Sequence, residues 1–505
     1  MSLPYQTFVL SAPGKGGVNE KLAPHLIRDD QSVAPNDSIL AEKNVHTDLN
    51  GAIVVRKGYE VYANLSTYFD DVAGIAQYKQ FDGDEFEIAC GVKSGTPKIV
   101  NFSSPSVPVD ITNAMTFTED KRFDFCQVAD KLILTTEASD APMVYVGGAT
   151  VSLLGGTPPS GKYCEEFYNY AILANTFANQ ERVYWSGLFD PETWPATNFK
   201  RMEGAVTGIA RKENSLIIFT RSSITVCQYT GDSLFPFSFD RLDTNIGCIS
   251  NLSIQNIEGV LYWLSADGHI YKMEGLQPEI VTEIIPKTVS ILIHSSLTKA
   301  VGINHRELRQ YWCAVTKDAT NNDFVIVIDY LNNEVRFFDN MEINYAANIS
   351  DSSGKIKTYF GDRTGRVYLT NQGNIDYLQG TATDINAWRY TKQFNMGDPA
   401  HPKRFSMIGA TINSSGDYVS TIQGFIDYGR TTTGQVEFSH NSGDSTWGTG
   451  IWGTFVWGRK DYLDRNEDIS GTGKYIQFKI SHTGRDEPVS YNELYCQYQT
   501  YARNC

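Results

Sequence analysis

The chain lacks most features that mark membrane, secreted or disulfide-rich proteins. No apolar run in its 505 residues approaches the roughly 20 residues that span a membrane. Residues 1–6 have no basic start and no apolar stretch after them, so we expect no secretory signal. The eight cysteines include no Cys-x-x-Cys pair, which predicts reduced and mostly buried thiols. These absences favour a globular protein without a membrane span.

Residue patterns that carry catalysis are also scarce. The 8 histidines include no helical i, i+4 pair with a glutamate, which argues against a zinc site. No Gly-x-Ser-x-Gly sequence marks a hydrolase nucleophile, and no spacing pairs two carboxylates as a glycosidase dyad. The sequence therefore predicts no catalytic, metal-binding or cofactor-binding residues, and we expect a protein that is not an enzyme.

Basic residues are outnumbered, since the formal net charge is −15. A surface that grips nucleic acid needs clustered Lys and Arg to displace counterions from the phosphates. The acidic balance argues against such a surface. It remains compatible with DNA that passes nearby without binding.

Aromatic residues and glycine are abundant, with 28 Tyr, 26 Phe and 42 Gly, which is typical of strands joined by turns. From about residue 70 to 380 a loose repeat of roughly 35–50 residues is present. One apolar strand recurs in it, at 86–91, 131–136, 216–220, 260–264, 310–315 and 357–361. A second strand follows, at 143–146, 224–229, 269–273, 325–330 and 366–369.

Short sheets at this spacing can bury their faces by packing around an axis, as in a β-propeller. Asp267-Gly268 and Thr364-Gly365 stand at hairpin positions of the repeat. We therefore predict an all-β protein whose residues 66–384 form a β-propeller of about six or seven blades. Residues 279–292 interrupt the pattern and are interpreted as a crossover or an insertion.

The two flanks differ from the repeat. Residues 1–65 are predicted to form an N-terminal arm with docking strands, including a short helix over 38–44 and a turn followed by a strand over 49–59. Such an arm usually docks on another surface, so deletion of residues 1–40 is expected to leave a folded monomer. The glycines at 14, 16 and 17 lack the flanking strand and Lys-Ser/Thr of a phosphate loop.

Residues 385–505 predict a β-sandwich-like domain of about 110 residues, a usual domain size. Strands are expected at 405–412, 421–428, 474–480 and 491–501, the third with strict alternation. Between them lies a Trp/Gly cluster, in which glycines permit close backbone approach and three rings supply buried area. These rings belong to Trp447, Trp452 and Trp457.

The stretch from residue 184 to 195 separates two predicted strand pairs and is the most distinctive in the chain. Tyr184, Trp185 and Ser186 end one strand, and Asp190 and Pro191 then suit a tight turn. Trp194 follows three residues later. We interpret these six residues as a structural motif that seats one sheet against the next, and the plainer alternative is an ordinary inter-strand turn.

One sequence pattern favours a different function. Residues 439–447 resemble the Asp-box turn of sialidase-like propellers, with Asn441 in place of Asp and a longer spacing. That turn is structural in sialidases and carries no chemistry. It occurs once in this chain and outside the repeat, and a sialidase would also need an arginine cluster.

Three features together resemble the tail nozzle (tail hub, or tail tubular protein B) family of short-tailed bacteriophages. The first is the N-terminal Gly-Gly-Val-Asn with the later stretch from Gly51 to Tyr59. The second is Tyr184-Trp185-Ser186 with the turn from Asp190 to Pro195. The third is the C-terminal Trp/Gly cluster followed by residues 473–477. The resemblance spans the whole chain but is diffuse, and the second feature is the most specific.

The resemblance implies a structural virion protein in the phage tail, assembled in the host cytoplasm. Six copies would form a homohexamer below the portal and adaptor proteins and carry tail fibres or tailspikes. Genomic DNA would pass through the lumen without specific binding. Arg363 and Arg366 are guesses for basic residues at a constriction, and ordinary solvated turn residues are the alternative. The runner-up function is a carbohydrate-binding or sialidase-like propeller that recognises a host surface.

Overall fold

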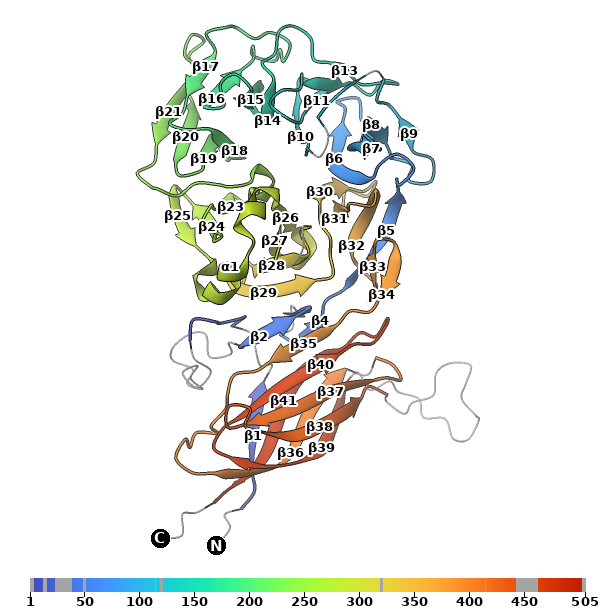
Figure 1. Cartoon of the computed structure of the whole chain (residues 1–505), viewed down its shortest axis with the longest axis vertical. Helices are drawn as coiled ribbons and strands as arrows, with labels where there is room; N and C mark the ends of the chain where they lie inside the picture. The colour runs from blue at the N-terminus through green and yellow to red at the C-terminus, as the bar shows by residue number, and fades with distance from the viewer. Residues whose placement is uncertain are drawn as a thin grey trace.

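The protein is built almost entirely from strands, arranged in two bodies that follow one another along its long axis (Figure 1). The computed structural model describes residues 4–11, 16–22, 39–48, 51–113, 115–118, 121–317, 321–413, 415–441 and 462–501. A β-propeller forms the larger body and a β-sandwich the smaller one. The predicted fold class is therefore confirmed.

The propeller contains seven four-stranded antiparallel sheets among the described residues. Blades 1–3 consist of β6 (Asp71–Lys79), β7 (Glu85–Lys93), β8 (Thr96–Asn101), β9 (Val109–Asp110); β10 (Asp124–Val128), β11 (Lys131–Thr135), β12 (Met143–Tyr145), β13 (Ser152–Leu153); β14 (Gly161–Phe167), β15 (Tyr170–Thr176), β16 (Arg182–Trp185) and β17 (Phe199–Arg201). Blades 4–6 consist of β18 (Val206–Lys212), β19 (Ser215–Thr220), β20 (Ile224–Tyr229), β21 (Phe237–Arg241); β22 (Gln255–Ile257), β23 (Val260–Leu264), β24 (Ile270–Glu274), β25 (Gln277–Ile280); β26 (Val301–His305), β27 (Gln310–Val315), β28 (Phe324–Asp329) and β29 (Glu334–Asp339). Blade 7 consists of β30 (Tyr345–Ser350), β31 (Ile356–Gly361), β32 (Arg366–Gln372) and β5 (Gly58–Asn64).

The recurring strands of the sequence are the second and third strands of the blades. These middle strands are rich in Leu, Ile and Val because both of their faces pack against neighbouring blades, and β27 and β28 are buried along their whole length. The first strand of each blade lies toward the middle of the ring and contacts the first strands on either side (Figure 1). The repeat prediction is confirmed, with seven blades.

The ring is closed by a strand from near the start of the chain. β5 pairs antiparallel with β32 as the outermost strand of blade 7, from Arg366 opposite Asn64 to Gln372 opposite Gly58. Blade 7 is thus assembled from two segments about three hundred residues apart in the sequence. Such closure joins the first and last blades through backbone hydrogen bonds and leaves no open seam in the ring.

Helix is confined to short pieces. They are η1 (Asn251–Ser253), η2 (Thr282–Ile284), α1 (Pro286–Ile291), η3 (His294–Lys299) and η4 (Arg306–Leu308). Pro286 stands at the first position of α1, where its missing N–H is not needed. The interruption expected over residues 279–292 is therefore the end of β25 followed by a helical connection between blades 5 and 6.

The sandwich packs two sheets face to face. One has the order β3 (Val45–Thr47), β4 (Ile53–Val55), β41 (Ser490–Thr500), β36 (Lys403–Asn413), β39 (Tyr462–Gly473), with β1 (Gln6–Ser11) also on β41. The other has the order β2 (Ala41–Lys43), β35 (Ala387–Tyr390), β40 (Ile476–His482), β37 (Val419–Ile426), β38 (Thr431–Ser439). A hairpin of β33 (Asp376–Leu378) and β34 (Thr381–Thr383) lies between the two bodies in the sequence. Alternate Ile and Phe side chains of both sheets form the core.

The N-terminal segment is divided between the two bodies. β1–β4 are strands of the sandwich, and β5 belongs to the propeller. Val18 and Ile39 bridge to each other and are buried in the core of blades 5 and 6. The expected arm with little core of its own is therefore wrong for this chain. The expected helix over 38–44 is also wrong, because β2 lies there and pairs with β35.

Candidate functional site at the junction of propeller and sandwich

The distinctive stretch from Tyr184 to Trp194 lies in blade 3, at the end of β16 and in the loop before β17. Ser186 accepts a hydrogen bond from the Ala171 N–H at 3.0 Å and is fully buried. The Asp190 carboxylate accepts bonds from the Glu192 N–H at 3.1 Å and the Thr193 hydroxyl at 2.6 Å. These bonds are used to build the loop itself.

Pro191, the last residue of this turn, is buried and accepts a hydrogen bond at its carbonyl from Trp194 Nε1 at 2.8 Å. Trp194 is half-buried against the core between blades 2 and 3. Tyr184 is half-buried and lies 5.8 Å from the Phe199 ring. Each of these side chains contacts its own loop or an adjacent strand.

Trp185 contributes most of this loop's core packing. Its ring is 9% exposed and lies 5.4 Å, edge to face, from Phe237 of blade 4. We expect Trp185→Ala to lower the free energy of unfolding by about 3–5 kcal/mol, the usual loss for a buried aromatic residue. Trp194→Ala serves as the comparison and should cost less because that ring is partly exposed. Urea denaturation measures both, and an equal or larger loss for Trp194→Ala would contradict the packing role of Trp185.

The other predicted structural residues, Trp447, Trp452 and Trp457, lie outside the described residues. Most of the Asp-box-like segment does as well. Its Asn441 is described and donates a hydrogen bond to Asp417 at 3.0 Å. Of the two arginines proposed for a constriction, Arg363 is exposed, and Arg366 is half-buried with Nη1 2.6 Å from the Thr364 hydroxyl.

Two carboxyl groups stand apart on the inner strands of blades 2 and 3. Asp124 accepts hydrogen bonds from the Cys164 N–H at 3.1 Å and the Asn251 side chain at 2.9 Å. Asn251 in turn accepts one from the Ile209 N–H at 3.0 Å. Burial raises the pKa of Asp124 to about 7, and burial together with Asp124 raises the pKa of Glu165 to about 8. This chain of bonds ties blade 2 to blades 3 and 4 across the inner strands.

The raised pKa values predict a loss of stability with rising pH. The folded protein holds protons on Asp124 and Glu165 that the unfolded chain releases above about pH 4, so the free energy of unfolding falls between about pH 4 and 8. Glu165→Gln should therefore be more stable than the parent at pH 8.5 and equal to it at pH 4. Glu203→Gln, at a 62% exposed side chain, is the control. Urea denaturation at both pH values tests this, and parallel pH profiles would refute it.

The junction between the two bodies contains a buried network of charges. The Glu42 carboxylate on β2 accepts hydrogen bonds from Arg336 on β29 at 3.1 and 3.2 Å and from Arg389 on β35 at 2.7 and 3.0 Å. Glu334, also on β29, pairs with Arg336. All four side chains are at most 3% exposed. Two carboxylates and two guanidinium groups thus balance in charge while joining blade 6 to the sandwich.

The network remains charged at neutral pH. Burial lowers the pKa of Arg389 to about 10, although Glu42 opposes the shift. Burial also acts to lower the pKa of Arg336, but the attraction of Glu42 and Glu334 outweighs it and raises this pKa. Arg336 makes one further bond, from Nη2 to the Thr47 hydroxyl at 2.7 Å. Its partners therefore come from both sheets of the sandwich and from its own blade.

A second buried ion pair reinforces the junction. Arg56, between β4 and β5, holds Asp376 of β33 in a two-point contact at 2.5 and 2.7 Å. Its Nε donates to Asn44 at 2.9 Å, and its Nη2 donates to the Asp339 carbonyl at 2.8 Å. A planar guanidinium with these partners fixes distance and orientation together. The N-terminal segment is thereby anchored where it passes from the sandwich to the propeller.

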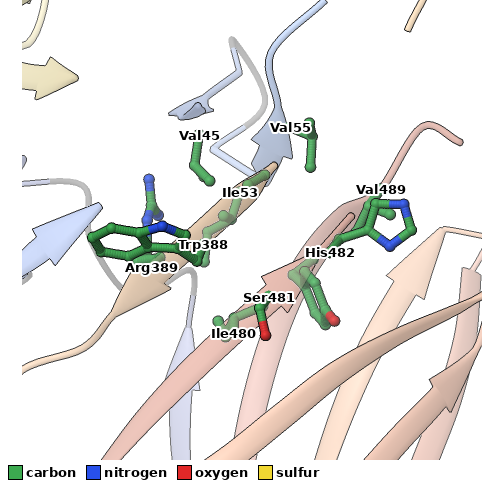
Figure 2. A pocket seen from close by; sticks show the side chains of 11 residues that line it. Val45, Ile53, Val55, Trp388, Arg389, Ile480, Ser481, His482 and Val489 are labelled. Atoms are coloured by element: carbon green, nitrogen blue, oxygen red, sulfur yellow. The ribbon is translucent and has the colours of Figure 1, made fainter. Parts of the chain in front are cut away.

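Three hollows surround this junction. Figure 2 shows the smallest, about 20 Å³, where Val45, Ile53 and Val55 of the N-terminal hairpin meet Trp388 and Ile480 of the sandwich. It is lined mainly by apolar side chains and has room for about one water molecule. A second hollow of about 590 Å³ lies against α1, blade 6 and Trp388, with carboxylates and lysines in its walls. A third, of about 480 Å³, lies between the β3–β4 hairpin and blade 6.

Exposed apolar side chains gather on one face of the propeller, called here the turn face. It carries the turns that join first to second and third to fourth strands of the blades. Its exposed large apolar residues are Phe81, Val107, Val146, Leu188, Phe189, Leu234, Phe235, Leu276 and Leu331. The patch in blades 3 and 4 is the most continuous, because the Phe189 N–H bonds the Asn169 carbonyl and the neighbouring Tyr168 ring stacks on Tyr229 at 4.5 Å. Phe177 is exposed on the opposite face.

Sequence reasoning missed the charged junction. Its members are spread over residues 42, 56, 334, 336, 376 and 389, and no spacing links them. The one signal was the alternation of Glu334 and Arg336 with apolar residues in a strand, which resembles an exposed face. These side chains are buried because another part of the chain covers that face.

The described part of the chain holds no group of three or more His, Cys, Asp or Glu side chains arranged to bind a metal ion. No described helix is long and apolar enough to cross a membrane. The seven described cysteines are buried and free, as expected for those positions.

No family model matches this chain. No curated protein matches it either. Among solved structures it is similar to an extracellular domain of a one component system from B. thetaiotaomicron, with 10% identity, a TM-score of 0.43, and coverage of 75% of this chain and 57% of that one. It is also similar to PorZ, a surface component of the type-IX secretion system of Porphyromonas gingivalis, with 12% identity, a TM-score of 0.38, and coverage of 75% and 46%. Kluyveromyces lactis Hsv2 has 10% identity, a TM-score of 0.30, and coverage of 48% and 70%.

The chain thus spans 57% of the first of these proteins and 46% of PorZ. At these TM-scores and identities the likeness supports no statement about function. The argument for function rests on the residues of this chain.

Proposed function

We propose that the chain is a structural subunit of a short phage tail, a nozzle or hub component below the portal and adaptor. The observation that supports this best is the junction. Buried ion pairs and a shared N-terminal segment hold propeller and sandwich as one body. A subunit that transmits force between its neighbours needs domains that do not hinge freely. The resemblance of residues 184–195 to the nozzle family points the same way.

In this proposal the path for DNA lies between copies and not along the axis of one propeller. Side chains tie the inner end of the ring: Asp124 reaches Asn251, and Arg122 reaches Asn344 at 3.1 Å and the Lys299 carbonyl. A ring of six copies repeats one head-to-tail contact and encloses a lumen. Portal and adaptor proteins would bind one side of this homohexamer, and tail fibres or tailspikes the other.

Locating the chain in a virus particle tests this function. Purified particles that encode it should contain six copies by quantitative mass spectrometry, and gold-labelled antibody should mark the tail. Absence of the chain from such particles would reject the proposal. A copy number other than six would reject the hexamer while leaving the tail location intact.

A conduit subunit should not bind DNA tightly, because a firm grip would stall ejection. With a net charge of −15 the protein lacks the counterion release on which ordinary DNA binders depend. We expect no measurable binding of a duplex at about 0.15 M salt in fluorescence anisotropy. A dissociation constant in the micromolar range or below at that salt would point instead to a DNA-gripping role.

The second candidate function is a propeller that binds carbohydrate on a host surface. The patch in blades 3 and 4 favours it, because Phe189 and Phe235 are 61% and 74% exposed and carboxylates stand beside them in the same loops. The sialidase form of this function gains no support from Tyr345, a buried tyrosine beside Arg122, since burial raises its pKa and a nucleophile needs a lowered one.

A glycan array separates the two candidate functions. The double variant Phe189→Ala/Phe235→Ala should abolish glycan binding if the second function holds. Phe177→Ala, 75% exposed on the opposite face, is the matched control and should bind as the parent does. Absence of binding by the parent itself would leave the tail function as the better supported one.

A further inference from the structure

The hollow between the β3–β4 hairpin and blade 6 has the dimensions of a small-molecule site. Its volume is about 480 Å³, and sites for small ligands usually measure about 300–1,000 Å³. One wall is the hairpin at residues 46–51. The other is formed by η4 and by the turn from β28 to β29. The site therefore lies between the two bodies of the protein and is distinct from the blade 3–4 patch.

The walls carry negative charge without a basic residue of their own. Four carboxylates line the hollow, from Asp48, Glu307, Asp329 and Glu334, and the lining includes no Lys or Arg. Glu334 is neutralised by Arg336, and Glu307 by Lys355 at 2.6 Å. Asp48 and Asp329 accept hydrogen bonds from backbone N–H groups, at 2.8 Å from Ala52 and at 3.0 and 3.1 Å from the turn after Asp329. Hydrogen bonds from neutral donors leave their charge in place, so the hollow attracts a cation.

A buried acceptor without a partner also lines the hollow. His46 is 7% exposed, and its Nδ1 has no hydrogen-bond partner among the described residues. Burial, reinforced by Arg336 and other cations, lowers the pKa of His46 to about 3, so the imidazole is neutral. A neutral imidazole presents a nitrogen lone pair that can accept an N–H bond. Buried polar atoms are rarely left unpaired, and this one indicates a donor that completes the site.

The spacing of the carboxylates selects the kind of cation. No three candidate ligands in the described chain are grouped closely enough to hold one metal ion. Separated acceptors in a roomy hollow suit an extended organic cation, whose N–H groups donate to several of them at once. We propose that this hollow binds an alkylammonium group, presented either by a free diamine or polyamine or by a lysine side chain of a partner protein.

Isothermal titration calorimetry on the full chain tests the site. The probes are putrescine, spermidine and Nα-acetyl-lysine methylamide, with tetramethylammonium as a cation that has no N–H donor. We expect saturable one-site binding of at least one amine and none of tetramethylammonium. Binding of putrescine or spermidine assigns a free amine as the source, and binding of the lysine amide alone assigns a protein side chain. Equal binding of tetramethylammonium, or no binding by any amine, would overturn the proposal.

Two variants place the binding. Leu331→Lys brings a tethered ammonium to the rim of the hollow, at a residue that is 50% exposed, and should weaken amine binding at least tenfold. Leu276→Lys adds the same charge at the equivalent turn of blade 5, at a residue that is 44% exposed, and should leave binding unchanged. Both positions are exposed turns, so both variants should fold. Equal loss in the two variants would show that overall charge, and not this hollow, governs the binding.

Discussion

Replacing Glu42 with leucine is expected to destabilise the protein by about 3–5 kcal/mol, because it leaves two buried arginines without their shared carboxylate. Arg336 and Arg389 are each 1% exposed and cannot regain water without opening the junction. The free energy of unfolding from urea denaturation gives the size of the loss. Small-angle X-ray scattering of the folded variant should show a wider range of positions for the sandwich against the propeller.

The control for this substitution is an exposed ion pair. Glu283 bonds Lys21 at 2.6 Å, but its side chain is 63% exposed, so Glu283→Leu should change stability by at most about 1 kcal/mol. The triple variant Glu42→Leu/Arg336→Met/Arg389→Met removes the charges together and should recover much of the lost stability. A small effect of Glu42→Leu alone would mean that water reaches the arginines.

Deleting residues 1–40 is expected to destabilise both bodies of the protein. The deletion removes Val18 and Ile39 from the core of blades 5 and 6, and burial of each such side chain contributes about 1.5–3 kcal/mol. It also removes β1, which leaves residues 493–498 of β41 unpaired on that side. A lower melting temperature and aggregation through the new edge should follow. This outcome replaces the expectation, drawn from the sequence, of an intact monomer.

Point variants separate burial from chain length. Val18→Ala and Ile39→Ala should each lower the melting temperature of the full chain, because both side chains are buried. Leu22→Ala lies in the same segment at a residue that is 43% exposed and should have little effect. If the deletion melted at the parent temperature, the N-terminal contacts with blades 5 and 6 would contribute nothing measurable to stability.

The propeller could be predicted because its repeat is written into local patterns. Apolar second and third strands recur, and turn residues such as Asp267-Gly268 stand between them, so each blade announces itself within about forty residues. The closing strand β5 could not be assigned, since its pairing with β32 depends on ring geometry. The same reason explains the failure of the arm: β1–β4 are short strands whose partners lie some 350–450 residues later in the sequence.

The site was harder to predict than the fold. Tyr184 to Trp194 attracted attention as a dense aromatic stretch, and the structure places it in loop building and packing within blade 3. The junction charges gave no comparable signal, because Glu334 and Arg336 alternate with apolar residues as solvent-facing residues do. Only the covering by β2 and β3 makes them buried, and that contact joins residues about 290 positions apart.

The closure of blade 7 by β5 also sets a schedule for synthesis. The ribosome releases residues 58–64 long before residues 366–372, their partner strand, exist. At about 5–20 residues per second the nascent strand waits roughly 15–60 s with its hydrogen-bonding edge open. β1–β4 wait longer still, for strands that include the end of the chain. The emerging N-terminus is thus a client for a holding chaperone, and slowing translation should increase the aggregated fraction of the product.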